Sequence, residues 1–357
     1  MECFLRILHA HARRYRVMTP CDAVKLAYQS AFGPGHMIAD AVAALERLRA
    51  EYDALPEKET GGTLTEEIGG GFVRLHLAAL DPAVLPLEAV NAMFCCSARM
   101  VSGDRKEIFA SAIEDIRRGC GEGYLPFSPA ELEEYLDAYE KAGMPAVSHS
   151  EAYRKACFPA YRVIRQEFVP YLAPIGAVYR LLAKKGRAVV AVDGMAGSGK
   201  STLAKLLAEL TGGEVIHMDD FFLPLSKRTA DRLAEPGGNV DYERFAAEVC
   251  PGLESGEAFS YGVFDCSVME IAGSREIGAC PVRIVEGSYA MHPVFGRYAG
   301  VTLFLHVSPE EQMRRITERN GEKMAEKFKN IWIPMENRYF REKHVAERCR
   351  FVIRNDG

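Results

Sequence analysis

The chain has 357 residues, of which 48% are apolar and 26% are charged, and its net charge is −5. This composition is typical of a globular protein and excludes a largely disordered chain or a fibrous repeat. The length predicts two domains, at about 150 residues each. Neither side of Ala183 has a basic excess, so we expect no nucleic-acid partner and no anionic membrane surface.

Ten cysteines are scattered along the chain without a CxxC pair, and they do not indicate a disulfide framework. We interpret Cys95-Cys96 as buried thiols. Arg6 interrupts the first apolar run, which argues against a secretory leader. The uncharged stretch Phe168–Tyr179 is too short to span a membrane. The sequence therefore predicts a cytoplasmic protein.

Residues 1–183 have the pattern of a mainly α-helical domain. Thr19-Pro20 is a helix start followed by a helical run over Ala23–Ala31, and Asp40–Tyr52 has apolar residues at helical spacing. Ser128-Pro129-x-Glu131 begins another helix with a capping box. Glycine-rich breakers, including Gly69-Gly70-Gly71, separate these segments.

After residue 185 short β-branched runs alternate with helical stretches, which predicts a second domain over residues 187–357. The expected strands are Ala188–Val192, Val215–Met218, Val282–Val285, Val301–Val307 and Phe351–Ile353. The expected helices between them are Ser201–Leu210, Tyr242–Val249 and Pro309–Asn320. This alternation indicates an α/β fold: a five-stranded parallel sheet with helices on both faces.

The first expected strand of this domain leads into Gly194–Ser201, which matches the phosphate-loop pattern GxxxxGK[ST] and is followed by a helix. The glycines allow backbone N–H groups to turn inward around an anion, and the helix dipole adds positive potential there. Lys200 is expected to reach the β- and γ-phosphates of ATP, and Ser201 to bind Mg²⁺. The predicted ATP-binding residues are Gly194, Ala196, Gly197, Ser198, Gly199, Lys200, Ser201 and Thr202.

Acidic residues follow the next two strands. Asp219 and Asp220 come after the second strand, and Glu286 comes after the third. Because ligands of an open parallel sheet bind beyond the carboxyl ends of its strands, these acids are expected to converge on the phosphate loop. We predict a metal site formed by Ser201, Glu286 and Asp219.

From Val189 to Ile353 the sequence resembles the uridine kinase–phosphoribulokinase group of P-loop kinases. The loop GMAGSGKS, the block HMDDFF, the triplet VEG and an arginine-bearing segment after the fourth strand fall in the family's order. The resemblance implies that Asp219 accepts the proton of the substrate hydroxyl and that Glu286 lies near the metal. It also implies a mobile lid that brings Arg314, Arg315 and Arg319 over the phosphates. The implied catalytic residues are Asp219, Lys200, Arg315 and Arg319.

The same resemblance implies that Asp241 binds ribose hydroxyls. Phe222 stands where the nucleoside kinases often have tyrosine, and Phe264-Asp265-Cys266 replaces their Tyr-Asp-Phe block. Met269 lies near the position of their base-reading histidine. We therefore predict ATP- and Mg²⁺-dependent phosphoryl transfer to a small metabolite, a nucleoside by preference, with Asp241, Phe222 and Phe264 as substrate residues. The alternatives are a kinase of a non-nucleoside sugar or vitamin-like alcohol, and an NTP-dependent switch.

Polar clusters in the helical domain indicate a second site, which comprises His36, Arg74, His76, His149 and Arg154. Arginine and histidine together suit a phosphorylated or carboxylated ligand. Capping histidines and structural ion pairs are the alternative. Two interpretations of the domain stay open: a second catalytic or ligand-sensing domain, or a helical module that shapes substrate choice or forms a homodimer.

Overall fold

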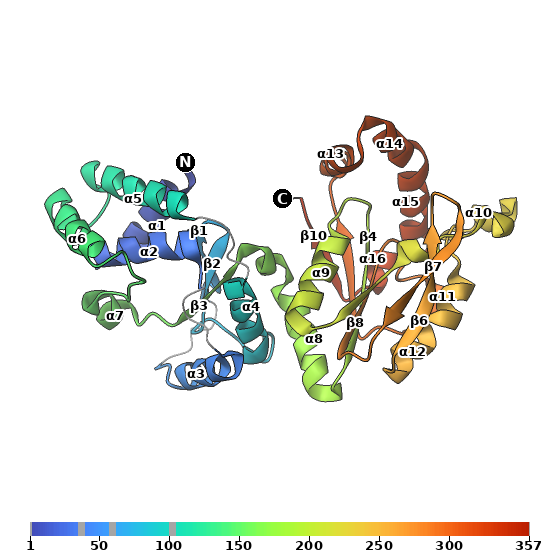
Figure 1. Ribbon diagram of the computed structural model, residues 1–357, viewed down its shortest axis with the longest axis horizontal. Coiled ribbons are helices and arrows are strands. Elements are labelled where there is room, and N and C mark those ends of the chain that lie inside the picture. The colour runs from blue at the N-terminus through green and yellow to red at the C-terminus, as the bar shows by residue number, and fades with distance from the viewer. Residues whose placement is uncertain (1, 35–39, 57–61, 100–104, 357) are drawn as a thin grey trace. The chain divides into compact units, whose positions relative to one another are not determined.

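The chain forms two compact units, Met1–Ala173 and Pro174–Gly357 (Figure 1). The computed structural model describes residues 2–34, 40–56, 62–99 and 105–356. Helix α8 (Leu172–Lys185) crosses the division, so most of it belongs to the second unit, and the expected boundary near residue 185 lies at its C-terminal end. Within the described ranges, no helix has both the length and the apolar character needed to cross a membrane.

The first unit is mainly helical. Its helices and strands are α1 (Glu2–Arg14), α2 (Pro20–Phe32), α3 (Ala41–Asp53), β1 (Thr65–Gly69), β2 (Phe72–His76), α4 (Leu87–Arg99), α5 (Lys106–Gly121), α6 (Pro129–Lys141), α7 (Glu151–Cys157), β3 (Tyr161–Arg165) and the 3₁₀ helix η1 (Gln166–Tyr171). The expected helix starts are present. Asp40 accepts hydrogen bonds from the first turn of α3, and Ser128 and Glu131 form the capping box of α6.

The first unit also contains an antiparallel sheet in the order β1-β2-β3, which the sequence patterns did not predict. Gly69-Gly70-Gly71 joins β1 to β2, and all three glycines have positive φ. A Cβ on Gly70 would lie 1.7 Å from the carbonyl oxygen of Ser30, so this turn requires glycine. The strands have five residues each and β3 comes from a distant part of the chain, so local periodicity gave little indication of them.

The second unit is an α/β fold. After α8 its elements are β4 (Ala188–Gly194), α9 (Lys200–Thr211), β5 (Glu214–His217), η2 (Met218–Phe221), η3 (Leu225–Lys227), α10 (Ala230–Ala234), α11 (Tyr242–Glu248), α12 (Cys250–Ser255), β6 (Phe259–Asp265), β7 (Glu270–Ile277), β8 (Val282–Glu286), η4 (Pro293–Phe295), β9 (Val301–His306), α13 (Pro309–Asn320), α14 (Glu322–Lys327), the π-helical turn η5 (Phe328–Trp332), α15 (Ile333–Glu342), α16 (Val345–Arg348) and β10 (Phe351–Arg354).

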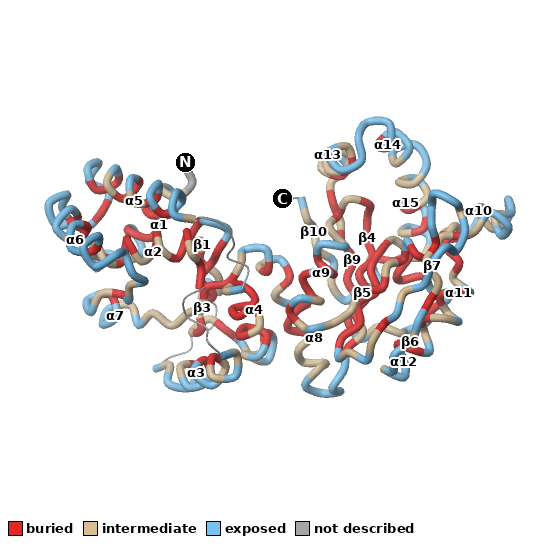
Figure 2. The backbone as a smooth tube through the Cα atoms, viewed as in Figure 1, coloured by how far each residue is buried: buried red, intermediate tan, exposed pale blue. Residues whose placement is uncertain are grey.

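Its main sheet is parallel in the order β10-β9-β4-β8-β5, so the five expected strands are confirmed. The central strands β9, β4 and β8 are largely buried (Figure 2). The edge strands β5 and β10 are mostly half-buried or exposed, so the expectation that all five strands are buried on both faces is wrong for these two, each of which has a neighbour on one side only. One face packs against α11, α12, α15 and α16 in a single apolar cluster that includes Ala191, Val285, Phe245 and Tyr339. Helix α9 contacts β4, β5 and β8, and its buried leucines lie outside that cluster. Two further strands, β6 and β7, form a separate antiparallel hairpin.

Candidate functional site

The phosphate loop lies between the end of β4 and the start of α9, as expected. Its glycines Gly194, Gly197 and Gly199 all have positive φ. At Gly194 a Cβ would lie 2.3 Å from the carbonyl oxygen of Leu305, the strand partner on β9. The close pairing of β4 with β9 therefore requires glycine at the start of the loop.

Three side chains from the last part of the chain hold the carbonyl groups of the loop. Gln312 donates to Ala196 O at 2.9 Å, Arg315 donates to Gly197 O at 3.2 Å, and Asn355 donates to Ser198 O at 2.8 Å. These contacts turn successive carbonyl oxygens toward α13 and the end of β10. When the carbonyl groups of the loop point outward in this way, its N–H groups can point inward. An anion-binding loop needs this arrangement, because its N–H groups must face the ligand.

Two charged side chains bind backbone groups of the loop: Lys200, which belongs to the loop itself, and Glu336 on α15. The ammonium group of Lys200 donates to Gly194 O at 2.8 Å and to Met195 O at 2.9 Å. Glu336, on α15, accepts a hydrogen bond from the backbone N–H of Ala196 at 3.0 Å. Sequence reasoning missed Glu336, because its distance from the loop along the chain gives no local signal.

A buried carboxylate fixes the base of the loop. Asp193 accepts hydrogen bonds from the N–H groups of Gly194 at 2.7 Å and Met291 at 2.9 Å, and from the Tyr339 hydroxyl at 3.0 Å. Burial raises the pKa of Asp193 to about 6, and these donors oppose the shift. Asp193 thus ties the loop to the segment after β8. Its position directly before the loop was a signal that could have identified it.

Two of the expected acids, Asp219 and Glu286, lie at the carboxyl edge of the sheet. The third, Asp220, is buried and accepts a hydrogen bond from the Tyr261 hydroxyl on β6 at 3.0 Å. The Ser201 hydroxyl donates to the Glu286 carboxylate at 3.1 and 3.2 Å, and His217 Nδ1 lies 2.5 Å from Glu286 Oε1. The hydrogen bond to Glu286 raises the pKa of His217. Asp219 follows on η2. His217 was not among the predicted residues, although it ends the same strand that precedes Asp219.

The pKa of Asp219 is raised, first by desolvation of its carboxyl group and then by the negative charge of Glu286, while the charge of Lys200 opposes the shift. The residue as a whole stays accessible to solvent, and this access moderates the desolvation effect. The charges of Glu286 and Lys200 therefore both act on the Asp219 carboxyl group. An accessible carboxylate in this position can accept a proton from a ligand.

The oxygen atoms of Ser201 and Glu286 at this edge are suitable ligands for Mg²⁺. A serine hydroxyl and a carboxylate are oxygen ligands, which this cation prefers, and Mg²⁺ usually takes only one or two protein carboxylates, with the remaining positions filled by water and phosphate. Across residues 2–34, 40–56, 62–99 and 105–356, no three His, Cys, Asp or Glu side chains are grouped so that they could hold a metal ion. The arrangement suits a cation shared with a phosphate ligand.

The predicted substrate residues lie on two neighbouring segments. Phe222 forms an antiparallel bridge with Val240, which places Asp241 beside the segment that follows Asp219. Asp241 is buried, caps α11, and forms an ion pair with Lys227 at 2.8 Å. The ring of Phe264 on β6 meets the ring of Phe222 edge to face at 6.3 Å between centroids.

The three expected lid arginines lie on α13, but only Arg315 is bound to the loop. It donates to Gly197 O and also pairs with Glu311 at 2.6 Å. Arg314 pairs with Glu311 and Glu318 on its own helix, and Arg319 donates to Asn320 at 2.9 Å. Thr202, the last predicted loop residue, lies exposed in the first turn of α9.

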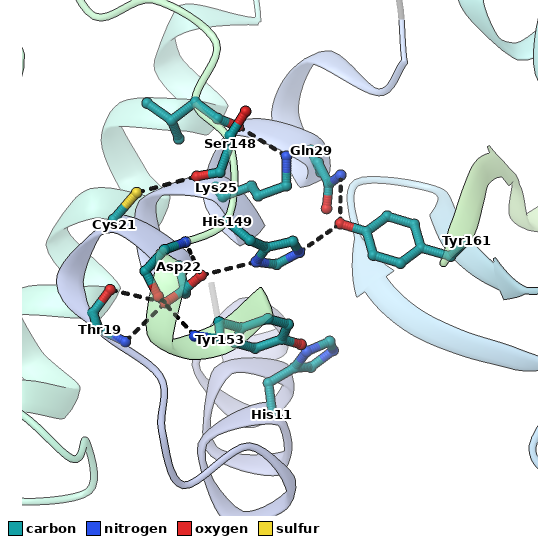
Figure 3. Close-up of polar contacts among 12 residues, drawn as sticks. His11, Thr19, Cys21, Asp22, Lys25, Gln29, Ser148, His149, Tyr153 and Tyr161 are labelled. Atoms are coloured by element: carbon teal, nitrogen blue, oxygen red, sulfur yellow. Dashed lines mark hydrogen bonds and ion pairs between the residues drawn. The ribbon is translucent and has the colours of Figure 1, made fainter. Parts of the chain in front are cut away.

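Part of the second predicted site forms a buried polar network in the first unit (Figure 3). His149 Nδ1 lies 2.8 Å from Asp22 Oδ1, and His149 Nε2 lies 2.7 Å from the Tyr161 hydroxyl. Gln29 donates to the same hydroxyl at 3.2 Å. Burial lowers the pKa of His149 to about 4 against the opposing hydrogen bond to Asp22, with the charge of Arg74 adding to the lowering.

The network continues from Gln29 to a buried arginine. Arg74 donates to Gln29 Oε1 at 3.1 and 2.8 Å, and lies 3.5 Å from the Glu66 carboxylate. His76 lies 3.4 Å from the same carboxylate. The structure thus places Arg74, His76 and His149 in one network with internal partners, whereas Arg154 is exposed on α7. The prediction for His36 lies outside the described residues.

No protein-family profile matches the chain. Solved structures are similar to about half of it. A possible uridine kinase from Bacillus stearothermophilus is 16% identical over 49% of this chain and 96% of its own, with a TM-score of 0.37. A candidate fructose transport system kinase from Silicibacter sp. TM1040 is 24% identical over 46% and 89%, also with a TM-score of 0.37. TT1252 from Thermus thermophilus is 22% identical over 48% and 90%, with a TM-score of 0.25.

Proposed function

We propose that the second unit is a phosphotransferase, which transfers the terminal phosphoryl group of ATP to a hydroxyl group of a small metabolite. The observation that carries this proposal is that the phosphate loop, the Ser201–Glu286 pair and Asp219 share one edge of the parallel sheet. A regulatory switch needs the loop but has no need of an acid that accepts a proton from a second ligand. Asp219 therefore favours the enzyme.

In this proposal the loop N–H groups and the start of α9 bind the phosphates of ATP. Lys200 exchanges its two carbonyl partners in the loop for phosphate oxygens. Ser201 and Glu286 supply oxygen ligands for Mg²⁺. The cation, when bound, neutralises charge on the phosphates.

The acceptor hydroxyl donates its proton to Asp219 as its oxygen forms a bond to the terminal phosphorus of ATP. The bond from that phosphorus to the bridging oxygen breaks, and ADP leaves with the electron pair. Because the transition state is loose and its charge is spread, positioning and cations supply most of the stabilisation. Lys200 and the lid arginines Arg315 and Arg319 supply the positive charge from the chain itself.

For the acceptor we propose a nucleoside. The aromatic pair Phe222 and Phe264 offers a surface for a planar base, and Asp241 offers a carboxylate to sugar hydroxyls. In the structure Lys227 already pairs with Asp241, so sugar hydroxyls would share or displace that partner. A sugar or a vitamin-like alcohol is the alternative acceptor. A screen of a metabolite pool with labelled ATP distinguishes them, and a labelled non-nucleoside product would exclude the nucleoside.

Two variants test the proposed roles. Lys200→Ala should weaken ATP binding and lower turnover together. Asp219→Asn should preserve ATP affinity and lower kcat by about a hundredfold or more, as expected when a positioned base is removed. Asp231→Asn, which removes an exposed acid on α10, is the matched control and should match the wild type.

The measurements are ATP affinity by calorimetry and phosphoryl transfer with the acceptor found in the screen. Equal transfer rates in Asp219→Asn and the wild type would exclude Asp219 from the mechanism. ATP turnover that no metabolite accelerates would contradict the kinase and favour the switch.

A further inference from the structure

Glu336 contacts the phosphate loop at Ala196 and the side chain of Ser288, which lies beside Gly194. It is 9% exposed on α15. Its Oε2 accepts the Ala196 N–H at 3.0 Å, and its Oε1 accepts the Ser288 hydroxyl at 2.8 Å. Ser288 in turn lies 3.2 Å from Gly194 O. The Glu336 carboxylate is therefore fixed by two hydrogen bonds at the loop, and it is not a surface acid that happens to lie nearby.

This contact places an anion where the motif binds one. The N–H groups of such a loop bind phosphate oxygens, and Glu336 already occupies the N–H of Ala196. Lys200 likewise bonds to loop carbonyls. Burial raises the pKa of Glu336, and the positive charge of Lys200 and the hydrogen bonds from Ser288 and Ala196 oppose that rise and favour the carboxylate. The loop thus has an internal acceptor at Ala196, and its lysine has internal acceptors.

We infer that Glu336 is a built-in competitor of the nucleotide phosphates, which leaves Ala196 when they bind and thereby sets nucleotide affinity. The inference rests on the proposed function, in that it takes the loop to bind a nucleotide. Its physical basis is that a phosphate and a carboxylate repel each other at the same N–H groups, most strongly where protein excludes water. Nucleotide binding therefore displaces the Glu336 side chain and changes the contacts of α15 with the loop.

The turn before α15 offers a way to observe this displacement. The segment Phe328–Trp332 is a π-helical turn, a rare geometry that often marks functional positions. Trp332 is the only tryptophan of the chain. It precedes Glu336 by four residues, about one helical turn, and its ring meets that of Phe328 at 4.6 Å between centroids. Movement of Glu336 away from the loop should change the surroundings of the indole.

The test compares Glu336→Gln with the wild type in the full chain. Glu342→Gln, which removes an exposed acid from the end of the same helix, is the matched control. Affinity for ADP and for inorganic pyrophosphate is measured by calorimetry, and Trp332 fluorescence is recorded in the same titrations. We expect Glu336→Gln to bind both probes about tenfold more tightly, because the repelling charge is gone. The control should bind as the wild type does.

The fluorescence of the wild type should change on saturation with either probe. The nucleotide-free spectrum of Glu336→Gln should already be shifted toward that of the saturated wild type. Ser288→Ala is a second variant, which frees one carboxylate oxygen and keeps the charge, so it should tighten binding by a smaller factor. Melting curves of both variants verify that they fold.

Equal or weaker binding by folded Glu336→Gln would overturn the inference, because the carboxylate would then support the loop and not compete with its ligand. If Glu336→Gln does not fold, unchanged or weaker binding by Ser288→Ala overturns it instead. A wild-type protein that binds neither ADP nor pyrophosphate would refute the proposed nucleotide site itself. The two failures are therefore distinguishable.

Discussion

Replacement of Gly194 by alanine should destabilise the second unit far more than the same change at a glycine in open space. Gly194 has φ +143°, and its added Cβ would lie 2.3 Å from Leu305 O, 2.7 Å from Leu305 N and 2.9 Å from Leu305 C. Ordinary contact begins at 3.4 Å, so strand β9 must move by about 1 Å. That movement disturbs the 3.0 Å hydrogen bond from Met195 N to Leu305 O.

The expected cost is about 3 kcal/mol or more. The backbone conformation costs about 1–3 kcal/mol for a residue with a Cβ, and loss of a backbone hydrogen bond costs about 1 kcal/mol. Gly212→Ala is the matched control, because Gly212 has φ +64° at the end of α9 and a Cβ there meets nothing within 4 Å. It should cost only the conformational part, about 1 kcal/mol.

Urea unfolding followed by Trp332 fluorescence measures both changes, because the only tryptophan lies in the second unit. Gly194→Ala should also abolish ADP binding, since the loop begins at the displaced strand, whereas Gly212→Ala should retain it. Equal losses of unfolding free energy in the two variants would contradict this prediction. It would show that β9 yields to the added methyl group without cost.

Two further predictions concern the first unit. The pKa of His149 is about 4 in the folded chain against 6.5 for the ordinary group, so the unfolded chain takes up the proton first as pH falls. The stability that neutral His149 contributes is present above pH 6.5 and is lost between pH 6.5 and 4, by up to about 3 kcal/mol. Calorimetry from pH 7 to 4 should show this loss reduced in His149→Gln, and an equal slope in both proteins would contradict it. Arg74→Met should destabilise the unit by about 2 kcal/mol, because it removes both hydrogen bonds to buried Gln29 Oε1 and one of the charged partners of Glu66, which keeps Arg14 at 3.3 Å. An unchanged melting transition would show that Arg74 contributes no stability.

Sequence patterns predicted what depends on neighbours along the chain. The turn of the phosphate loop could be predicted from the residues Gly194–Ser201 alone. Its glycines permit the positive φ angles, and the residues that follow begin a helix. The β-branched runs of the second unit predicted all five strands. For the central strands β4, β8 and β9 the reason is that a strand buried on both faces must be apolar throughout. Capping residues such as Asp40 and Ser128 marked helix starts for the same local reason.

Contacts between distant segments decided the rest. Strands β1 and β2 pair across a glycine turn, yet their sheet is completed by β3 from much later in the chain, so the first unit could be predicted only as helical. His149 pairs with Asp22 across 127 positions of sequence, and a hydrogen bond of that kind leaves no periodic pattern.

The candidate site shows the same division. Sequence patterns were enough to predict the phosphate loop together with Asp219 and Glu286, because chain direction in a parallel sheet brings the strand ends to one edge. They could not show that Glu336 meets Ala196, since the two lie 140 positions apart. Only the packing of α15 against the sheet brings that carboxylate to the loop, where burial leaves the N–H of Ala196 and the Ser288 hydroxyl as its hydrogen-bond donors.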